Sequence, residues 1–124
     1  MLLLGSAGVA AAATINGDAG TDIIVGNNDA DTINGHGGND AIDGRRGNDT
    51  ISGGNGDDIV QGGQGSDNIT AGAGRDIIAG SNGNDTIFLG GGNERDIVNC
   101  GDGTDTVAGK SPTDVTSSDC ETVS

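Results

Sequence analysis

Aspartate recurs along this chain at a fixed interval, and that interval constrains the fold more than any other feature. The aspartates are spaced nine residues apart, with one wider spacing of eleven between Asp85 and Asp96. The series comprises Asp22, Asp31, Asp40, Asp49, Asp58, Asp67, Asp76, Asp85, Asp96, Asp105 and Asp114. Two positions after each of the first ten comes a β-branched apolar residue, as Ile24 follows Asp22. Such a repeat predicts one small structural unit copied along the chain.

The composition is unlike that of an ordinary globular domain. The 124 residues predict a single domain, yet they include 26 Gly, one aromatic residue and a formal net charge of −14. A chain of this kind cannot bury enough apolar surface to offset its conformational entropy, so composition alone predicts disorder. The repeat indicates order instead. The prediction from composition and the prediction from the repeat agree if a cation neutralises the acidic residues and links successive units. The charge and the lack of a basic stripe exclude a nucleic-acid partner.

Each unit has glycines at defined places. With the aspartate at position six, positions one and four are mostly glycine, and the consensus is G-G-x-G-x-D-x-U-x, in which U is a large apolar residue. The segments 53–61 and 62–70 match this consensus at every defined position. The glycines predict a tight turn. The last three positions predict a very short strand whose middle side chain points inward.

The consensus closely resembles the RTX, or haemolysin-type, calcium-binding nonapeptide-repeat family. The resemblance covers about residues 14–108. It implies an all-β fold, a right-handed parallel β-roll (a β-solenoid) of about five coils, in which two units make one 18-residue coil. It also implies Ca²⁺ ions between stacked turns, held by carboxylates one coil apart and by turn carbonyls. Calcium suits such sites because it prefers six to eight hard oxygen ligands and tolerates imperfect geometry.

Carried onto this sequence, the resemblance predicts two rows of calcium ligands. One row is Asp22, Asp40, Asp58, Asp76 and Asp96, with Asp114 next in line; the other is Asp31, Asp49, Asp67, Asp85 and Asp105. Neighbours within the rows give five plus four pairs, so up to about nine ions. The unit before Asp96 is irregular, with two inserted residues, and the pattern dissolves at Lys110-Ser111-Pro112. The predicted ligands are therefore the first ten aspartates, without Asp114.

The two ends of the chain differ from the repeat. Residues 1–13 form an apolar run that is too short to span a bilayer; they predict a signal peptide, or alternatively an N-terminal helix that caps the first coil. Residues 109–124 predict a C-terminal cap. Cys100 and Cys120 lie close to two repeat lengths apart, so stacking would bring them together as a disulfide. The alternative is two reduced thiols in a cytosolic chain.

Position seven of each unit predicts two outward faces. One face carries Ile23, Ala41, Ile59, Ile77, Ile97 and Val115; the other carries Thr32, Thr50, Asn68, Thr86 and Thr106. The apolar stripe indicates an interface, or only β-propensity on a small surface. The threonine ladder is similar to the flat arrays of ice-binding solenoids, although Asn68 interrupts it.

No catalytic motif accompanies the repeat, since neither G-x-S-x-G nor H-E-x-x-H occurs, and the prediction is that the protein is not an enzyme. We expect a secreted protein, extracellular or at the cell surface, that folds on calcium and has a structural or interaction role. Its expected partners are calcium ions and further copies of itself, end to end or laterally, with no membrane span in the mature chain. The alternatives are a calcium-dependent folding or secretion module of a larger toxin or hydrolase, and an ice-binding solenoid.

Overall fold

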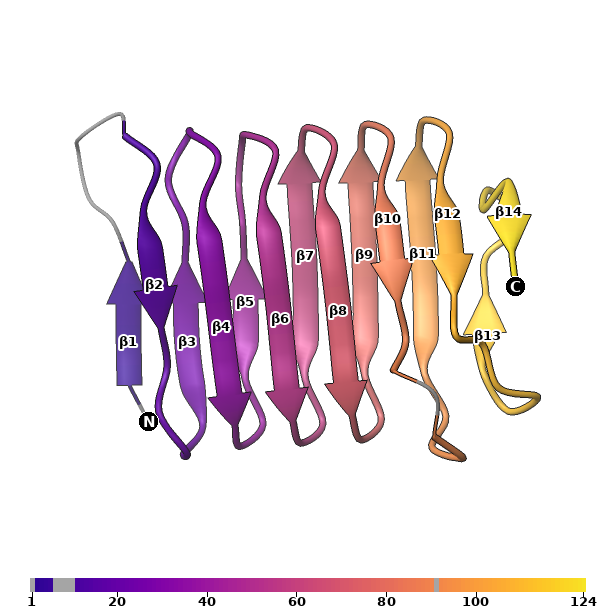
Figure 1. Ribbon diagram of the computed structural model, residues 1–124, viewed down its shortest axis with the longest axis horizontal. Helices are drawn as coiled ribbons and strands as arrows, with labels where there is room; N and C mark the ends of the chain where they lie inside the picture. Colours follow the sequence, from indigo (N-terminus) through magenta and orange to yellow (C-terminus); the bar gives the residue numbers. More distant parts are fainter. Residues whose placement is uncertain (1, 6–10, 91) are drawn as a thin grey trace.

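The chain winds into a parallel β-solenoid, described by a computed structural model that covers residues 2–5, 11–90 and 92–124. Strands at the front of Figure 1 run downward and those behind run upward while the chain advances along the long axis, which makes the coil right-handed. Each strand pairs in parallel with the strand one coil away. The predicted all-β, right-handed solenoid is confirmed. It has about six turns, because segments before and after the regular repeats extend both sheets.

Two seven-stranded sheets face each other. One sheet holds the odd-numbered strands β1 (Leu2–Gly5), β3 (Asp22–Val25), β5 (Ala41–Asp43), β7 (Ile59–Gln64), β9 (Ile77–Asn82), β11 (Ile97–Asp102) and β13 (Val115–Thr116). The other holds β2 (Thr14–Asn16), β4 (Thr32–Gly37), β6 (Thr50–Asn55), β8 (Asn68–Ala73), β10 (Thr86–Phe88), β12 (Thr106–Ala108) and β14 (Thr122–Val123). The register joins equivalent residues of successive coils, as Ile51 pairs with Ile69. Residues 18 positions apart in the sequence therefore occupy equivalent places in neighbouring coils.

A narrow apolar core lies between the sheets. Its members are the β-branched residues of position eight, with Ala71, Leu89 and Cys100: Ile15, Ile24, Ile33, Ile42, Ile51, Val60, Ile69, Ala71, Ile78, Ile87, Leu89, Val98, Cys100 and Val107. Each regular unit contributes one large buried side chain, so the apolar surface buried per residue is small. Interactions at the turns must therefore supply much of the cohesion.

Six of the strands are twice as long as the three residues that the repeat predicts, whereas β2, β5, β10 and β12 have the predicted length. Strands β4, β6, β7, β8, β9 and β11 each span six residues, and they continue into the first positions of the next unit. The reason is that the small residues there stack in register, as Gly54 does on Gly72, so the backbone ladder is not interrupted. The turns proper shrink to about three residues, which brings the aspartates of neighbouring coils close together.

The N-terminal segment adds a strand rather than a helix. Residues 2–5 form β1, which pairs with β3, so the alternative of a capping helix is wrong for these residues. The rest of the predicted signal segment lies partly outside the described residues, at 1 and 6–10. No helix in the described ranges is long and apolar enough to cross a membrane.

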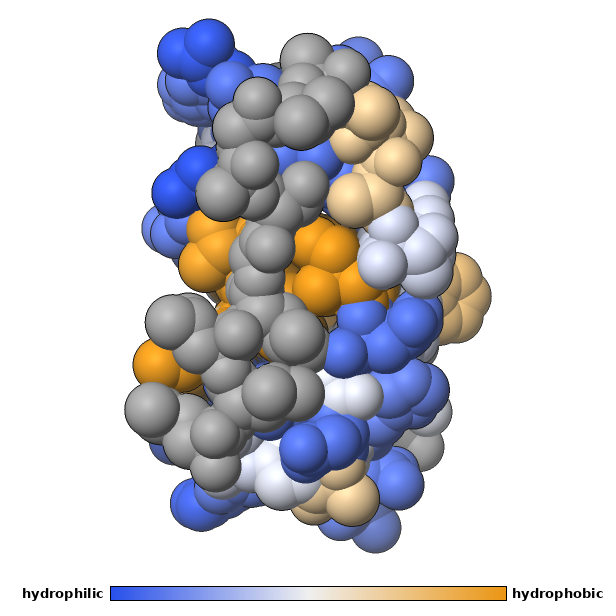
Figure 2. Space-filling model, turned by 90° about the vertical axis from the view of Figure 1, so that its left-hand side faces the viewer, coloured by the Kyte–Doolittle hydropathy of each residue, from blue (hydrophilic) through white to orange (hydrophobic). Residues whose placement is uncertain are grey.

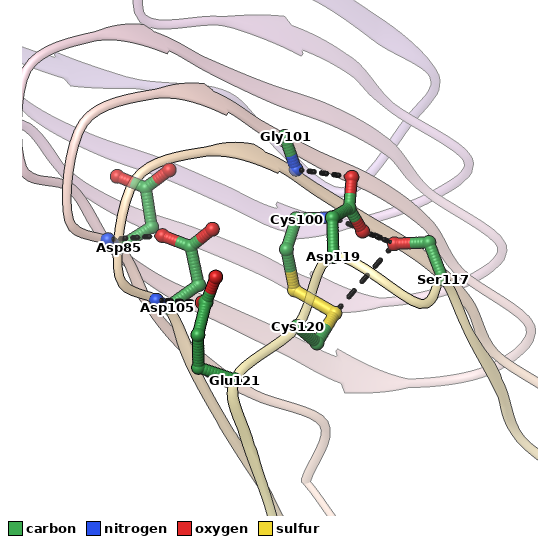
Figure 3. Close-up of a disulfide and its surroundings, with 8 residues drawn as sticks. All are labelled: Asp85, Cys100, Gly101, Asp105, Ser117, Asp119, Cys120 and Glu121. Carbon is green, nitrogen blue, oxygen red and sulfur yellow. Dashed lines mark hydrogen bonds between the residues drawn. A yellow bond between two sulfur atoms is a disulfide. The ribbon is translucent and has the colours of Figure 1, made fainter.

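The C-terminal end is closed by the predicted disulfide. Cys100 and Cys120 are bonded, with their Cα atoms 5.3 Å apart, and Figure 3 shows the bridge joining the tail to the last full coil. Strand β13 continues the odd sheet and β14 continues the even sheet. Asp119 accepts a hydrogen bond from the backbone N–H of Gly101 at 3.0 Å, so the tail also satisfies a turn amide.

Removing the disulfide should destabilise the calcium-loaded protein. The bond closes a loop with a sequence separation of 20 residues, and loop closure of this size stabilises by about 3 kcal/mol. We expect the double variant Cys100→Ala/Cys120→Ala to unfold at lower denaturant concentration than the parent. Position one already holds a buried alanine at Ala71, so alanine fits such a place. A reductant should lower the midpoint of the parent and leave that of the variant unchanged; equal midpoints for parent and variant would contradict the prediction.

Candidate metal centre

The aspartates form two hydrogen-bonded rows, one along each turn edge of the solenoid. In both rows a backbone N–H donates to the Oδ1 atom of the aspartate one coil later, at 2.7–3.0 Å. One row is Asp22, Asp40, Asp58, Asp76, Asp96 and Asp114, and the other is Asp31, Asp49, Asp67, Asp85 and Asp105. All eleven side chains are buried. The structure therefore brings the sequence-predicted residues together in the two rows expected.

The second carboxylate oxygen is the unusual feature of these rows. Among the described residues, Oδ2 is buried without a hydrogen-bond partner in Asp40, Asp49, Asp58, Asp67, Asp76, Asp85 and Asp105. In contrast, Oδ2 of Asp31 accepts from the N–H of Asn27, and Oδ2 of Asp114 accepts from the N–H of Ser111. A buried ionised oxygen without a partner is strongly unfavourable, so a cation bound at these oxygens would stabilise the middle of each row.

Carbonyl oxygens converge on the same places. A side-chain carbon added at Gly44 would lie 2.5 Å from Oδ2 of Asp49 and 2.6 Å from the carbonyl oxygen of Gly62. At Gly53 the corresponding distances, to Asp58 and to the carbonyl of Ala71, are also 2.5 and 2.6 Å. Position one must therefore be small because carboxylate and carbonyl oxygens of two successive coils approach it. Carboxylate and carbonyl oxygens are the ligands that calcium prefers.

Burial makes these carboxyl groups hard to ionise. It raises the pKa from 3.8 to about 6 in Asp49, Asp58, Asp76 and Asp85, with like charges in the row adding to the effect. Burial also raises the pKa of Asp40, Asp67, Asp96 and Asp105. In each case the N–H from the preceding coil opposes the rise. Neutralisation of the rows by protons or by a cation therefore lowers the free energy of the folded state.

The irregular unit departs from the sequence assignment. Counting back from Asp96 at position six places position one at Gly91, which lies outside the described residues. Instead, Leu89 is buried in the core directly after β10, as Ala71 is in β8, and Gly90 takes the positive φ of position two (82°). The two inserted residues therefore lengthen the turn between Gly90 and Asp96 rather than precede it. A leucine side chain occupies the place that glycine leaves open elsewhere. This difference agrees with the irregularity seen in the sequence and distinguishes Asp96 from the aspartates that follow a glycine at position one.

One carboxylate was missed. The N–H of Asp105 donates to Oε2 of Glu121, so glutamate continues the row for one more coil, and Figure 3 shows Asp85, Asp105 and Glu121 in succession. Glu121 follows Asp105 by 16 residues, whereas neighbouring aspartates in the rows are 18 or 20 residues apart, so the repeat interval did not predict this contact. The signal was present in the parallel spelling of Asp105-Thr106-Val107 and Glu121-Thr122-Val123, whose last two residues pair in the structure.

The donor set fits a hard divalent cation. Buried carboxylates, each with an oxygen left unpaired, alternate with carbonyls, whereas imidazole and free thiolate are absent from the rows. The residues with both an unpaired Oδ2 and a glycine at position one are Asp40, Asp49, Asp58, Asp67 and Asp85. When bound, the ion would supply charge neutralisation and a bridge between coils. The fold and the site together define a cation-binding β-roll.

Comparison with protein families gives the same class a more specific identity. The model of the RTX calcium-binding nonapeptide repeat matches four times, at residues 7–42, 16–51, 34–69 and 61–93. These matches span more than half of the chain, which therefore belongs to this family. The nonapeptide repeats of the family bind Ca²⁺, and its members are typically secreted, structural or calcium-binding proteins. No curated protein and no solved structure matches the chain.

Neighbouring aspartates of the same turn should respond differently to mutation. Asp58 is buried in the row, whereas the side chain of Asp57 is 43% exposed and accepts hydrogen bonds from Arg75. Asp58→Asn keeps an oxygen for the N–H of Asp40 but removes the charge. We expect it to raise the calcium concentration at the folding midpoint on the order of tenfold. The matched control Asp57→Asn should leave the midpoint nearly unchanged; equal shifts in circular dichroism titrations would count against the assignment of the row.

The raised carboxyl pKa values predict opposite effects of pH with and without calcium. Without calcium, the folded roll binds more protons than the unfolded chain between about pH 4 and about pH 6. Its stability should therefore rise as the pH falls through that window and be lost as the pH rises through about 6. With calcium, protons compete for the same oxygens, so the calcium midpoint should increase below about pH 6. Thermal melts in chelator and calcium titrations at several pH values test both signs.

Proposed function

We propose that this protein is a secreted calcium-binding β-roll that folds on meeting extracellular calcium and then acts as a structural or interaction protein. The observation that carries the proposal is the pair of buried carboxylate rows, each with oxygen atoms that lack a partner. Like charges stacked coil upon coil oppose folding, and a divalent cation between them would reverse the sign of that interaction.

The proposed ligands are the ten aspartates from Asp22 to Asp105 in the two rows. Five of them, Asp40, Asp49, Asp58, Asp67 and Asp85, combine an unpaired oxygen with a glycine cradle, so we place the strongest sites at these residues. These ten give four plus four pairs of neighbours, and the pair of Asp96 with Asp114 at the end of its row brings the number of ions up to about nine. That number of divalent charges would exceed the formal charge of −14 and would explain why so acidic a chain can be compact.

The proposed domain organisation follows the same boundaries as the sequence. Residues 1–13 act as a signal segment, 14–108 as the calcium-binding roll and 109–124 as the cap. The disulfide between Cys100 and Cys120 supports passage through an oxidising compartment. The sequence pattern contains no catalytic constellation, and the rows commit the carboxylates to cations, so we propose no enzymatic activity for this chain.

Two features support self-association. The stripe of position seven runs in register across the odd sheet and exposes Ile23, Ile59, Ile77, Ile97 and Val115 by 37–56%. The N-terminal end shows hydrophobic surface at mid-height (Figure 2), and β1 and β2 form the outer edges of the two sheets there. Open strand edges and apolar patches favour association. The stripe favours lateral contacts, and the end favours stacking into fibres.

Folding on calcium is the first test. In chelator at neutral pH we expect the circular dichroism spectrum of a largely disordered chain, and in millimolar calcium the spectrum of a β-rich protein. Magnesium at the same concentration is the control and should leave most of the chain unfolded, since it requires a stricter octahedral geometry. A spectrum that does not change across the calcium titration would refute calcium-dependent folding.

Self-association has its own test. Light scattering and negative-stain microscopy in calcium should show oligomers or fibres, and Ile59→Thr/Ile77→Thr should reduce lateral association without loss of β structure. Threonine fits because it occupies the same repeat position on the opposite sheet. The control Thr50→Val on that sheet should have little effect. A strictly monomeric parent at high concentration would refute the assembly proposal while leaving calcium binding intact.

A further inference from the structure

A polar groove lies on one turn edge, next to the odd sheet. It adjoins the apolar stripe, since Asp43 and Gln61 line both the groove and a shallow hollow over Ile23 and Ile59. The groove has a volume of about 530 Å³, and we call it the arginine groove after Arg45 and Arg46. Its other side chains are those of Asn28, Asp43, Gln61, Gln64, Ser81 and Asn82. Its floor includes Gly63, which has no side chain, while the equivalent positions one coil before and one coil after hold Arg45 and Ser81. The hollow therefore arises because a glycine lies between two residues with side chains.

The groove concentrates positive charge in an acidic molecule. Only five basic residues oppose 19 acidic ones, and two of the five are adjacent here. The groove also holds one carboxylate, Asp43, which accepts a hydrogen bond from the backbone N–H of Arg45 at 3.0 Å, so the two arginines outnumber it. Arg75 pairs with Asp57 at 3.0 Å on the other turn edge, whereas in the described ranges neither Arg45 nor Arg46 makes an ion pair. Both are exposed. A guanidinium without a partner offers a planar fork that matches a carboxylate or sulfate group.

The backbone at the groove is held in an unfavourable conformation. Arg45 has φ of 76° and Ser81 has φ of 86°, whereas Gly63 between them has φ of 113° at the same position. Residues with a Cβ avoid this region of φ, and several other units of the repeat carry glycine at this position. Two of the three described non-glycine residues with positive φ thus flank one groove. Strain of this kind concentrates at binding sites.

The remaining lining groups suit a hydroxyl-rich ligand. Arg46, Gln64 and Asn82 stand in register on three successive coils, and coils repeat at about 4.8 Å. Amide side chains both donate and accept hydrogen bonds, as sugar hydroxyls do. An extended ligand could therefore contact one polar side chain per coil. The single aromatic residue of the chain lies elsewhere, so base stacking has no platform here.

From these observations we propose that the arginine groove binds an acidic saccharide, a linear glycan that carries carboxylate or sulfate groups. Arg45 and Arg46 hold the anionic group, and Gln61, Gln64, Ser81 and Asn82 bind the hydroxyls. This activity is separate from calcium binding, although it needs the folded stack of coils that forms the groove.

The chain itself provides a variant that should bind less without folding worse. Arg45→Gly/Arg46→Gln replaces both arginines with the residues that the next coil carries at the same positions, Gly63 and Gln64, and it relieves the positive φ of Arg45. The charge-matched control is Arg75→Asn/Arg95→Asn, which also removes two positive charges but lies outside the groove. All proteins are compared in millimolar calcium, with circular dichroism to verify folding.

Isothermal titration calorimetry should be done with four probes: an oligosaccharide of hyaluronan, one of chondroitin sulfate, a neutral chito-oligosaccharide of equal length, and inorganic sulfate. We expect the parent to bind an acidic oligosaccharide and not the neutral one, and the groove variant to bind it weaker by about tenfold for each arginine removed. The control variant should bind like the parent.

Several results would overturn the proposal. These are no binding of either acidic oligosaccharide by the folded parent, equal binding of the neutral one, equal loss in both double variants, and sulfate binding as tight as that of the oligosaccharides. The last would indicate a simple anion site. Calcium bridging between the protein and the glycan would give equal affinities for the parent and the groove variant, and this too would exclude the arginine groove.

Discussion

The rest of the structure depends on one repeated contact, the hydrogen bond from a backbone N–H to the aspartate Oδ1 one coil later. This contact joins successive coils at their turns, places each carboxylate inside the turn and leaves its second oxygen near the next coil's carbonyl. It makes the fold dependent on its environment. The same geometry that joins coils also stacks negative charges, so the sign of the net interaction is set by whatever neutralises them.

The thin core makes that dependence strong. Each regular nine-residue unit buries a single large apolar side chain, such as Ile51 or Ile69. Little other apolar packing joins the two sheets. In a larger globular domain, apolar burial would outweigh a few unfavourable carboxylates. Here the core is too thin to outweigh the charges of the rows in the same way, so the stability of the fold should depend on what neutralises them.

Most of the fold and of the candidate site could be predicted from the sequence because both follow from a period. The interval from Asp22 to Asp40 gives the coil, and the apolar residue two places later gives the inward direction. Features that depend on tertiary context could not be predicted in this way. The place of Leu89 in the core, the six-residue strands and the role of Glu121 arise from how the insertions and the cap pack on the neighbouring coils. The groove around Arg45 requires Gly63 from the next coil, and the sequence around Arg45 does not show which residue will stack on it.

The alternation of outward faces has a further consequence for how such a chain can change in length. The isoleucine stripe and the threonine ladder belong to opposite sheets, so successive units differ in parity although their turns are chemically alike. Gain or loss of 18 residues preserves every face beyond the change. Gain or loss of nine would send each downstream strand to the other sheet and exchange the apolar and hydroxyl surfaces. The sequence repeats every nine residues, but the outward surfaces are preserved only when two consecutive units are gained or lost together.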